Sequence, residues 1–136
     1  MRLVRSIPAL PVQDIQRAVE FYSQRLDFSC DVQKDDFARV VRDEVAVDLW
    51  LAWDRSWRAR TDALAVAPVQ SGAESFLAGT ASCRIEVQGI DALYAEYKPQ
   101  GVLYGPDTVV EKTPWSTREF AALDLERNLL TFYEVR

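Results

Sequence analysis

The tetrapeptide Val12-Gln13-Asp14-Ile15 returns, with one residue changed, as Val87-Gln88-Gly89-Ile90, 75 positions further along the chain. Each copy closes a strand-like run and opens a run of apolar residues with helical spacing. Tyr22 and Tyr97 stand at the same offset. Self-similarity at a fixed period is typical of folds built from repeated units. The sequence therefore predicts a chain made of two copies of one unit.

The first copy has the pattern of a strand, a helix and three further strands. Asp14 is a residue type that caps helix N-termini. The apolar residues that follow it lie on one helical stripe, namely Ile15, Ala18, Val19, Tyr22 and Leu26. Residues 28–33, 37–42 and 45–51 have the composition of strands, and the polar pairs between them suit turns.

The second copy repeats this order. A strand is expected over 81–87 and is followed by a helix, which Pro99 and Gly101 end. The apolar stripe of that helix consists of Ile90, Leu93, Tyr94 and Tyr97. Short strands are then expected around Val102, around Val109, over 119–123 and over 129–135.

We expect one domain over residues 1–136, with a first repeat at about 1–53, an insertion at 54–79 and a second repeat at about 80–136. The predicted fold class is α+β, with two βαβββ modules. Together they would form one cupped, half-open mixed sheet with the helices outside. The inner wall of such a sheet offers a concave surface on which a ligand can bind.

Composition restricts the partners. The 136 residues are 49% hydrophobic and 27% charged, as in an ordinary soluble protein, and the net charge of −5 argues against nucleic acid as a partner. No apolar run reaches the roughly 20 residues that a membrane-spanning helix needs, and the N-terminus has no secretory pattern. Cys30 and Cys83 have neither metal nor disulfide spacing. We therefore expect a cytoplasmic protein with both thiols reduced and buried in strands.

Two segments indicate a particular protein family more specifically than the repeat does: Asp35-Asp36-Phe37-Ala38 and Pro114-Trp115-Ser116-Thr117-Arg118-Glu119-Phe120. With them, the chain resembles the vicinal oxygen chelate superfamily of glyoxalases, extradiol dioxygenases and bleomycin resistance proteins. Within that superfamily it is most similar to the bleomycin-binding resistance proteins. The resemblance runs from about Ser6 to Tyr133, apart from the longer insertion.

The resemblance implies that this chain holds no metal. Enzymes of the superfamily place metal ligands at three positions, which in this sequence are Ile7, Ser82 and Thr131. An aliphatic side chain and two neutral hydroxyls make a poor divalent-metal site. The chain also contains no histidine, so Ser-His and Cys-His pairs are excluded. We expect no cofactor and no catalysis.

The resemblance also implies which residues bind a ligand. Phe37 and Trp115 would be the two aromatic walls around a planar group. Carboxylates that could meet a cationic ligand are Asp31, Asp36 and Asp48, and further residues of the inner wall are Trp50, Ser82 and Arg84. From the residues alone, Phe37 could equally be a core side chain, and each carboxylate a solvated surface group. Trp53 and Trp57 are the next candidates.

Two positions depart from the relatives. A positive Arg84 on the inner wall would disfavour a cationic drug unless Glu86 or an aspartate neutralises it. The turn Leu125-Glu126-Arg127-Asn128 replaces the usual Pro-x-Gly-Asn. These departures bear on the identity of the ligand.

Pro8 matches the hinge proline at which similar proteins exchange an N-terminal strand, which implies a domain-swapped homodimer. The expected function is sequestration of a bleomycin-type glycopeptide antibiotic, or a similar planar cationic ligand, without modification. Two alternatives stay open: an enzyme of the same fold that acts on a small metabolite, and a binder of another planar aromatic compound. Neither nucleic acid nor membrane is expected as a partner.

Overall fold

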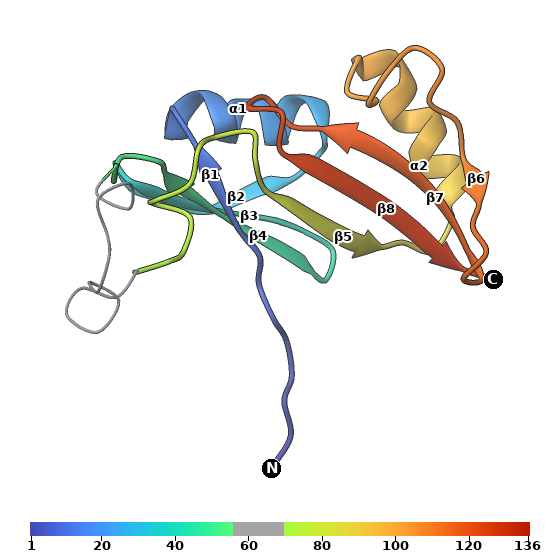
Figure 1. Ribbon diagram of the computed structural model, residues 1–136, viewed down its shortest axis with the longest axis horizontal. Helices are drawn as coiled ribbons and strands as arrows, with labels where there is room; N and C mark the ends of the chain where they lie inside the picture. The colour runs from blue at the N-terminus through green and yellow to red at the C-terminus, as the bar shows by residue number, and fades with distance from the viewer. Residues whose placement is uncertain (56–69) are drawn as a thin grey trace.

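The computed structural model describes residues 1–55 and 70–136. Both halves have the predicted order of strand, helix and three strands (Figure 1). The elements are β1 (Ala9–Val12), α1 (Ile15–Arg25), β2 (Ser29–Gln33), β3 (Phe37–Arg42), β4 (Val45–Leu51), β5 (Ser82–Glu86), α2 (Ile90–Tyr97), a 3-10 turn (Lys98–Gln100), β6 (Glu111–Lys112), β7 (Thr117–Leu123) and β8 (Leu129–Val135).

The strands form two four-stranded mixed sheets, in the orders β1-β4-β3-β2 and β5-β8-β7-β6. The prediction of an α+β fold with two modules is confirmed, whereas the prediction of one continuous sheet is wrong. Each module pairs its first strand, in parallel, with its own last strand. Each sheet is therefore completed within its own module.

The first module forms as its sequence pattern requires. The Asp14 carboxylate accepts a hydrogen bond from the Arg17 backbone N–H at 3.0 Å and caps α1. The apolar stripe of α1 is buried against β3 and β4. Alternation along β4 buries Val47 and Leu49 under the helix and turns Asp48 and Trp50 to the opposite, inner face.

The second module is built in the same way. Gly89 adopts φ +92° at the start of α2, and Gly101 adopts φ +70° just after the 3-10 turn, which ends the helix as predicted. The buried face of α2 packs on the sheet, where Phe120 and Phe132 stack with their ring centroids 5.3 Å apart. Ser82, Arg84 and Glu86 of β5 face the other way and are exposed.

The repeated tyrosines connect the two modules. The Tyr22 hydroxyl donates to Asp124 in the second module at 2.9 Å, and the Tyr97 hydroxyl donates to the Leu26 carbonyl in the first at 2.8 Å. Both tyrosines are fully buried. Burial raises the pKa of Tyr97 to about 12 and that of Tyr22 well above its usual value, so both remain neutral donors.

A buried polar cluster strengthens this connection. The Asn128 amide donates to the Pro11 carbonyl at 2.9 Å and to Asp124 at 3.1 Å, and its oxygen accepts from the Gly79 and Ala81 backbone N–H groups. Burial raises the pKa of Asp124, against the hydrogen bonds that favour its charged form. The turn 125–128 therefore fastens the second module to β1.

Some sequence predictions were wrong in detail. Near Val102 there is only an isolated bridge at Leu103, and the strand expected near Val109 is the two-residue β6. Cys30 is exposed, because β2 is an edge strand whose residues are all exposed, and Cys83 is half-buried. Within 1–55 and 70–136, no helix is long and apolar enough to cross a membrane.

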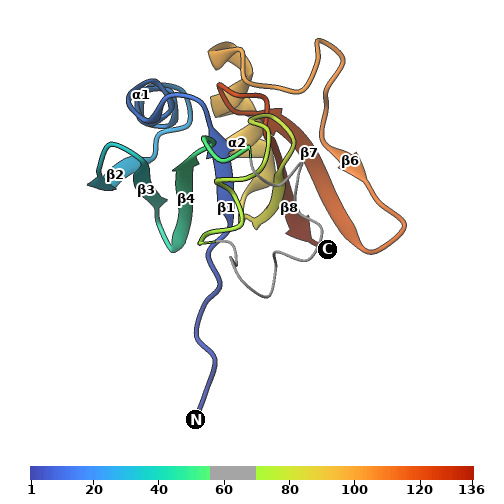
Figure 2. The same ribbon diagram turned by 60° about the vertical axis from the view of Figure 1, so that its left-hand side comes forward.

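Residues 1–8 leave the body of the molecule as an extended arm (Figures 1 and 2). Its apolar side chains are strongly exposed, with Leu3 at 97% and Val4 at 79%. After β4, the Asp54 backbone N–H donates to the Glu74 carbonyl, and the Ser75 hydroxyl donates to the Asp54 carboxylate. These contacts join the first residue of the expected insertion to residues 74 and 75. Trp57 lies outside the described residues.

Candidate functional site

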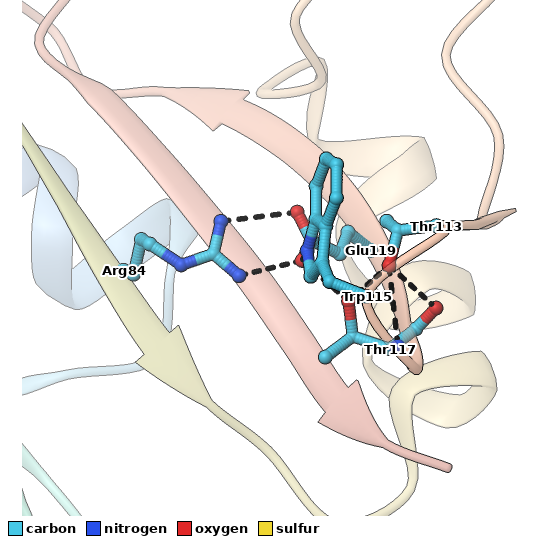
Figure 3. A network of polar contacts seen from close by, with 5 residues as sticks. All are labelled: Arg84, Thr113, Trp115, Thr117 and Glu119. Carbon is cyan, nitrogen blue, oxygen red and sulfur yellow. Dashed lines mark hydrogen bonds and ion pairs between the residues drawn. The ribbon is translucent and has the colours of Figure 1, made fainter.

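Arg84 and Glu119 form a bidentate salt bridge on the inner face of the second sheet (Figure 3). Arg84 Nη1 donates to Glu119 Oε1 at 3.1 Å, and Arg84 Nη2 donates to Oε2 at 2.5 Å. The Arg84 side chain is 49% exposed, whereas that of Glu119 is only 12% exposed. The arginine therefore reaches an enclosed carboxylate from the open side of the sheet.

Trp115 lies beside this carboxylate at the start of β7. Its indole N–H donates to Glu119 Oε2 at 2.9 Å, and the Thr117 hydroxyl donates to the same oxygen at 2.6 Å (Figure 3). Between them Ser116 adopts φ +65°, which makes the tight turn. The tryptophan is 61% exposed. Its ring is thus open to solvent while its edge is held in place by Glu119.

The electrostatics of Glu119 follow from these contacts. The Arg84 guanidinium, helped by the Thr117 and Trp115 donors, lowers the pKa of Glu119 to about 2 against the cost of its burial. The same guanidinium lies over the Tyr133 ring, 4.7 Å from its centroid. Arg84 is thus neutralised, by Glu119 rather than by Glu86 or an aspartate, the partners that the sequence suggested.

An open pocket of about 350 Å³ adjoins these residues. It is lined by Trp115, Glu119 and Thr131, together with the exposed Tyr104. Of the three positions that the resemblance equates with metal ligands, Thr131 lines this pocket, Ser82 is exposed on β5, and Ile7 lies in the N-terminal arm. Across 1–55 and 70–136, no three Cys, Asp or Glu side chains come together as metal ligands. The residues named from its lining offer aromatic faces, a carboxylate and a hydroxyl.

The inner face of the first sheet carries a similar arrangement. Phe37 and Trp50 are cross-strand partners with ring centroids 4.7 Å apart. Beside them Arg39 makes a bidentate salt bridge with Asp48, from Nε to Oδ1 at 2.6 Å and from Nη2 to Oδ2 at 3.1 Å. The Arg39 guanidinium carbon lies 5.8 Å from the Phe37 ring centroid. Asp48 is therefore already engaged by an arginine.

The structure groups the predicted site residues into two sets. Phe37, Asp48 and Trp50 share the first sheet, while Ser82, Arg84 and Trp115 belong to the second. Asp31 and Asp36 are exposed on β2 and on the turn after it. The start of β3 and the start of β7 are at opposite ends of the molecule in Figure 1. Phe37 and Trp115 therefore do not form one sandwich within a chain.

Sequence reasoning missed Glu119, Thr117, Tyr133 and Tyr104. The indication available in the sequence was the alternation along 117–123, which places Thr117 and Glu119 on the same face. The pairing of Glu119 with Tyr133 is known only from the register of β7 and β8. The pairing of Glu119 with Arg84 joins residues 35 positions apart and depends on the sheet order.

Comparisons with known proteins agree with this architecture. The profile of the Glyoxalase/Bleomycin resistance protein/Dioxygenase superfamily matches residues 6–132. Proteins named bleomycin resistance protein from Geobacillus stearothermophilus and Staphylococcus aureus are 46% identical over 132 residues, covering 97% of this chain and 97% of theirs.

Solved structures give the same result. The bleomycin-binding protein from Streptomyces verticillus, complexed with copper(II)-bleomycin, has a TM-score of 0.70 at 25% identity, covering 97% of this chain and 96% of that one. The bleomycin resistance determinant of transposon Tn5 has a TM-score of 0.71 at 17% identity, covering 98% and 99%. The chain therefore belongs to the Glyoxalase/Bleomycin resistance protein/Dioxygenase superfamily.

Proposed function

We propose that this protein binds a bleomycin-type glycopeptide antibiotic and sequesters it without chemical modification. The observation that carries the proposal is the exposed Trp115, whose edge is fixed by Glu119 at the mouth of an open pocket. A large exposed aromatic beside a pocket is typical of a binding surface for a flat ligand. The names of the relatives that are 46% identical support the same ligand class.

We propose that the complete site belongs to a homodimer. Phe37 and Trp115 lie on different sheets and at opposite ends of one chain, so a second chain is needed to bring one of each together. The arm before Pro8 supports this arrangement. Its exposed Leu3 and Val4 would be covered if the arm crossed to a partner.

We propose binding without catalysis or metal. The chain lacks histidine, and the positions that correspond to metal ligands are Ile7, Ser82 and Thr131. Binding alone is enough for sequestration, because a drug held in a complex is not free to reach its target. We also retain the proposals of a single domain with repeats at about 1–53 and 80–136, and of a cytoplasmic location.

The test is calorimetric titration of the purified protein with metal-free and copper-loaded bleomycin, beside a panel of unrelated planar drugs. We expect saturable binding of bleomycin, with recovered drug of unchanged mass. A different planar compound binding in its place would move the assignment to the alternative ligand class. Turnover of a small metabolite, or an altered mass of recovered bleomycin, would overturn the non-catalytic proposal. Light scattering of the same samples should give twice the mass of the 15.5 kDa chain.

A further inference from the structure

We infer that the Glu119 carboxylate is the receptor for a cationic group of the bound ligand, and that Arg84 occupies this receptor as an internal substitute while the protein is free. This inference rests on the proposed function and specifies what the site recognises. It starts from the unequal exposure of the two partners, 12% for Glu119 and 49% for Arg84.

The carboxylate is held in place independently of Arg84. The Trp115 indole and the Thr117 hydroxyl both donate to Oε2, at 2.9 and 2.6 Å, from the strand and turn that carry Glu119 itself. Arg84 supplies the hydrogen bond to Oε1 from a different strand, at 3.1 Å. When Arg84 moves away, the carboxylate stays oriented and Oε1 becomes free for another donor. A pre-organised acceptor of this kind binds without an ordering cost.

The groups around the Arg84 guanidinium are those of a binding site for a planar cation. It combines a fork-accepting carboxylate with the face of Tyr133, whose centroid is 4.7 Å from the guanidinium carbon. Carboxylates bind guanidinium groups in bidentate fashion, and aromatic faces attract the same cations. The ligand class is therefore one with a guanidinium or amine group next to its planar part, since Trp115 borders the same carboxylate.

Displacing Arg84 costs less than breaking a buried pair, because half of its side chain is already in water and the freed guanidinium is hydrated there, while the displacing cation takes over its bonds to Glu119. A neutral planar ligand has no cationic group to bind Glu119 and leaves the Arg84–Glu119 pair intact. A cationic ligand replaces Arg84 and gains a pre-formed acceptor. Arg84 thus lowers the affinity for every cationic ligand, and its removal raises that affinity.

The first test removes the Arg84 guanidinium by mutation and asks whether a small cation binds in its place beside Glu119 and Tyr133. In Arg84→Ala, benzylguanidinium should give a saturable shift of the Trp115 indole ¹H–¹⁵N resonance, which is assigned by its loss in Trp115→Phe. The shift should disappear in Arg84→Ala/Glu119→Gln. Arg118→Ala is the matched control. Arg118 lies on β7, as Glu119 does, but on the opposite face, where it makes a bidentate salt bridge with Asp91 at 2.8 Å. Arg84→Met keeps an apolar stem over Tyr133 and replaces Arg84→Ala if the latter folds poorly.

The second test uses bleomycin. Arg84→Ala should bind metal-free bleomycin about tenfold more tightly than the parent protein, about 1.4 kcal/mol, and Glu119→Gln should bind it more weakly. No saturable shift with benzylguanidinium in either Arg84 variant, or weaker bleomycin binding in both, would overturn the inference. If the parent protein binds no bleomycin, the proposed function fails, while the benzylguanidinium titration still decides whether Glu119 is a cation receptor.

Discussion

Replacing Asn128 by alanine should destabilise the protein more than any other single change at the junction of the two modules. Asn128 is fully buried, and its side chain makes four hydrogen bonds, to Pro11, Asp124, Gly79 and Ala81. Truncation leaves the Pro11 carbonyl and the Gly79 and Ala81 N–H groups without their partner. A buried polar group left unsatisfied costs about 1–3 kcal/mol.

With three such groups, of which the two N–H groups are only partly buried, and the lost contact to Asp124, the free energy of unfolding should fall by about 3–5 kcal/mol. For a domain of this size, that lowers Tm by about 10–15 °C. The measurement is urea and thermal unfolding at neutral pH, with the protein concentration held constant because a dimer's stability depends on it.

Glu126→Ala is the matched control. Glu126 also joins the two modules, by accepting a hydrogen bond from the Gln13 backbone N–H at 3.1 Å, but this contact is exposed. Water can replace the lost acceptor, so the cost should stay below about 1 kcal/mol. If Asn128→Ala costs no more than Glu126→Ala, the buried cluster does not hold the modules together and the reasoning is refuted.

Three further predictions concern the turn, the site and acid stability. Arg127→Gly should stabilise the protein by up to about 1 kcal/mol in urea unfolding, because Arg127 adopts φ +70°, where glycine is free of strain; an unchanged midpoint would contradict this. Trp115→Ala and Phe37→Ala should each weaken bleomycin binding by about 1–3 kcal/mol and combine non-additively, whereas full-strength binding by the double variant would assign both to packing. Because Glu119 has its pKa lowered from 4.5 to about 2, its stabilisation is present above about pH 4.5 and is lost as the pH falls towards 2. Asp124, whose pKa is raised, contributes in the opposite direction. Glu119→Gln should therefore flatten the loss of Tm between pH 5 and pH 2, by roughly its share of that stabilisation, and an unaltered profile would show that the Arg84 pair contributes nothing.

The fold could be predicted from the sequence where one residue type forces one local structure. Asp14 caps α1 as expected, and the strand expected over 45–51 is β4. The 75-residue offset places Tyr22 and Tyr97 in equivalent positions, and the structure adds that each donates across to the other module. Edge effects were not predictable: the exposure of Cys30 depends on which strand ends the sheet.

The site was predictable only in part. Trp115 was expected to be an aromatic wall of the binding site, and it is 61% exposed beside the pocket. For Arg84 the sequence suggested Glu86 or an aspartate as a possible counterion, whereas Glu119 could be assigned to it only once β5 and β7 were known to flank β8. Long-range pairing of this kind is set by sheet order, which local patterns do not encode.

The most direct test of the central claim is a calorimetric titration of a mixed dimer that contains one Trp115→Ala chain and one Phe37→Ala chain. If each site takes Phe37 from one chain and Trp115 from its partner, the mixed dimer has one site with both walls and one with neither. We predict bleomycin binding with the affinity of the parent protein at half its stoichiometry. Sites contained within single chains would each lack one wall. Two weakened sites per mixed dimer, with none at parental affinity, would contradict the account.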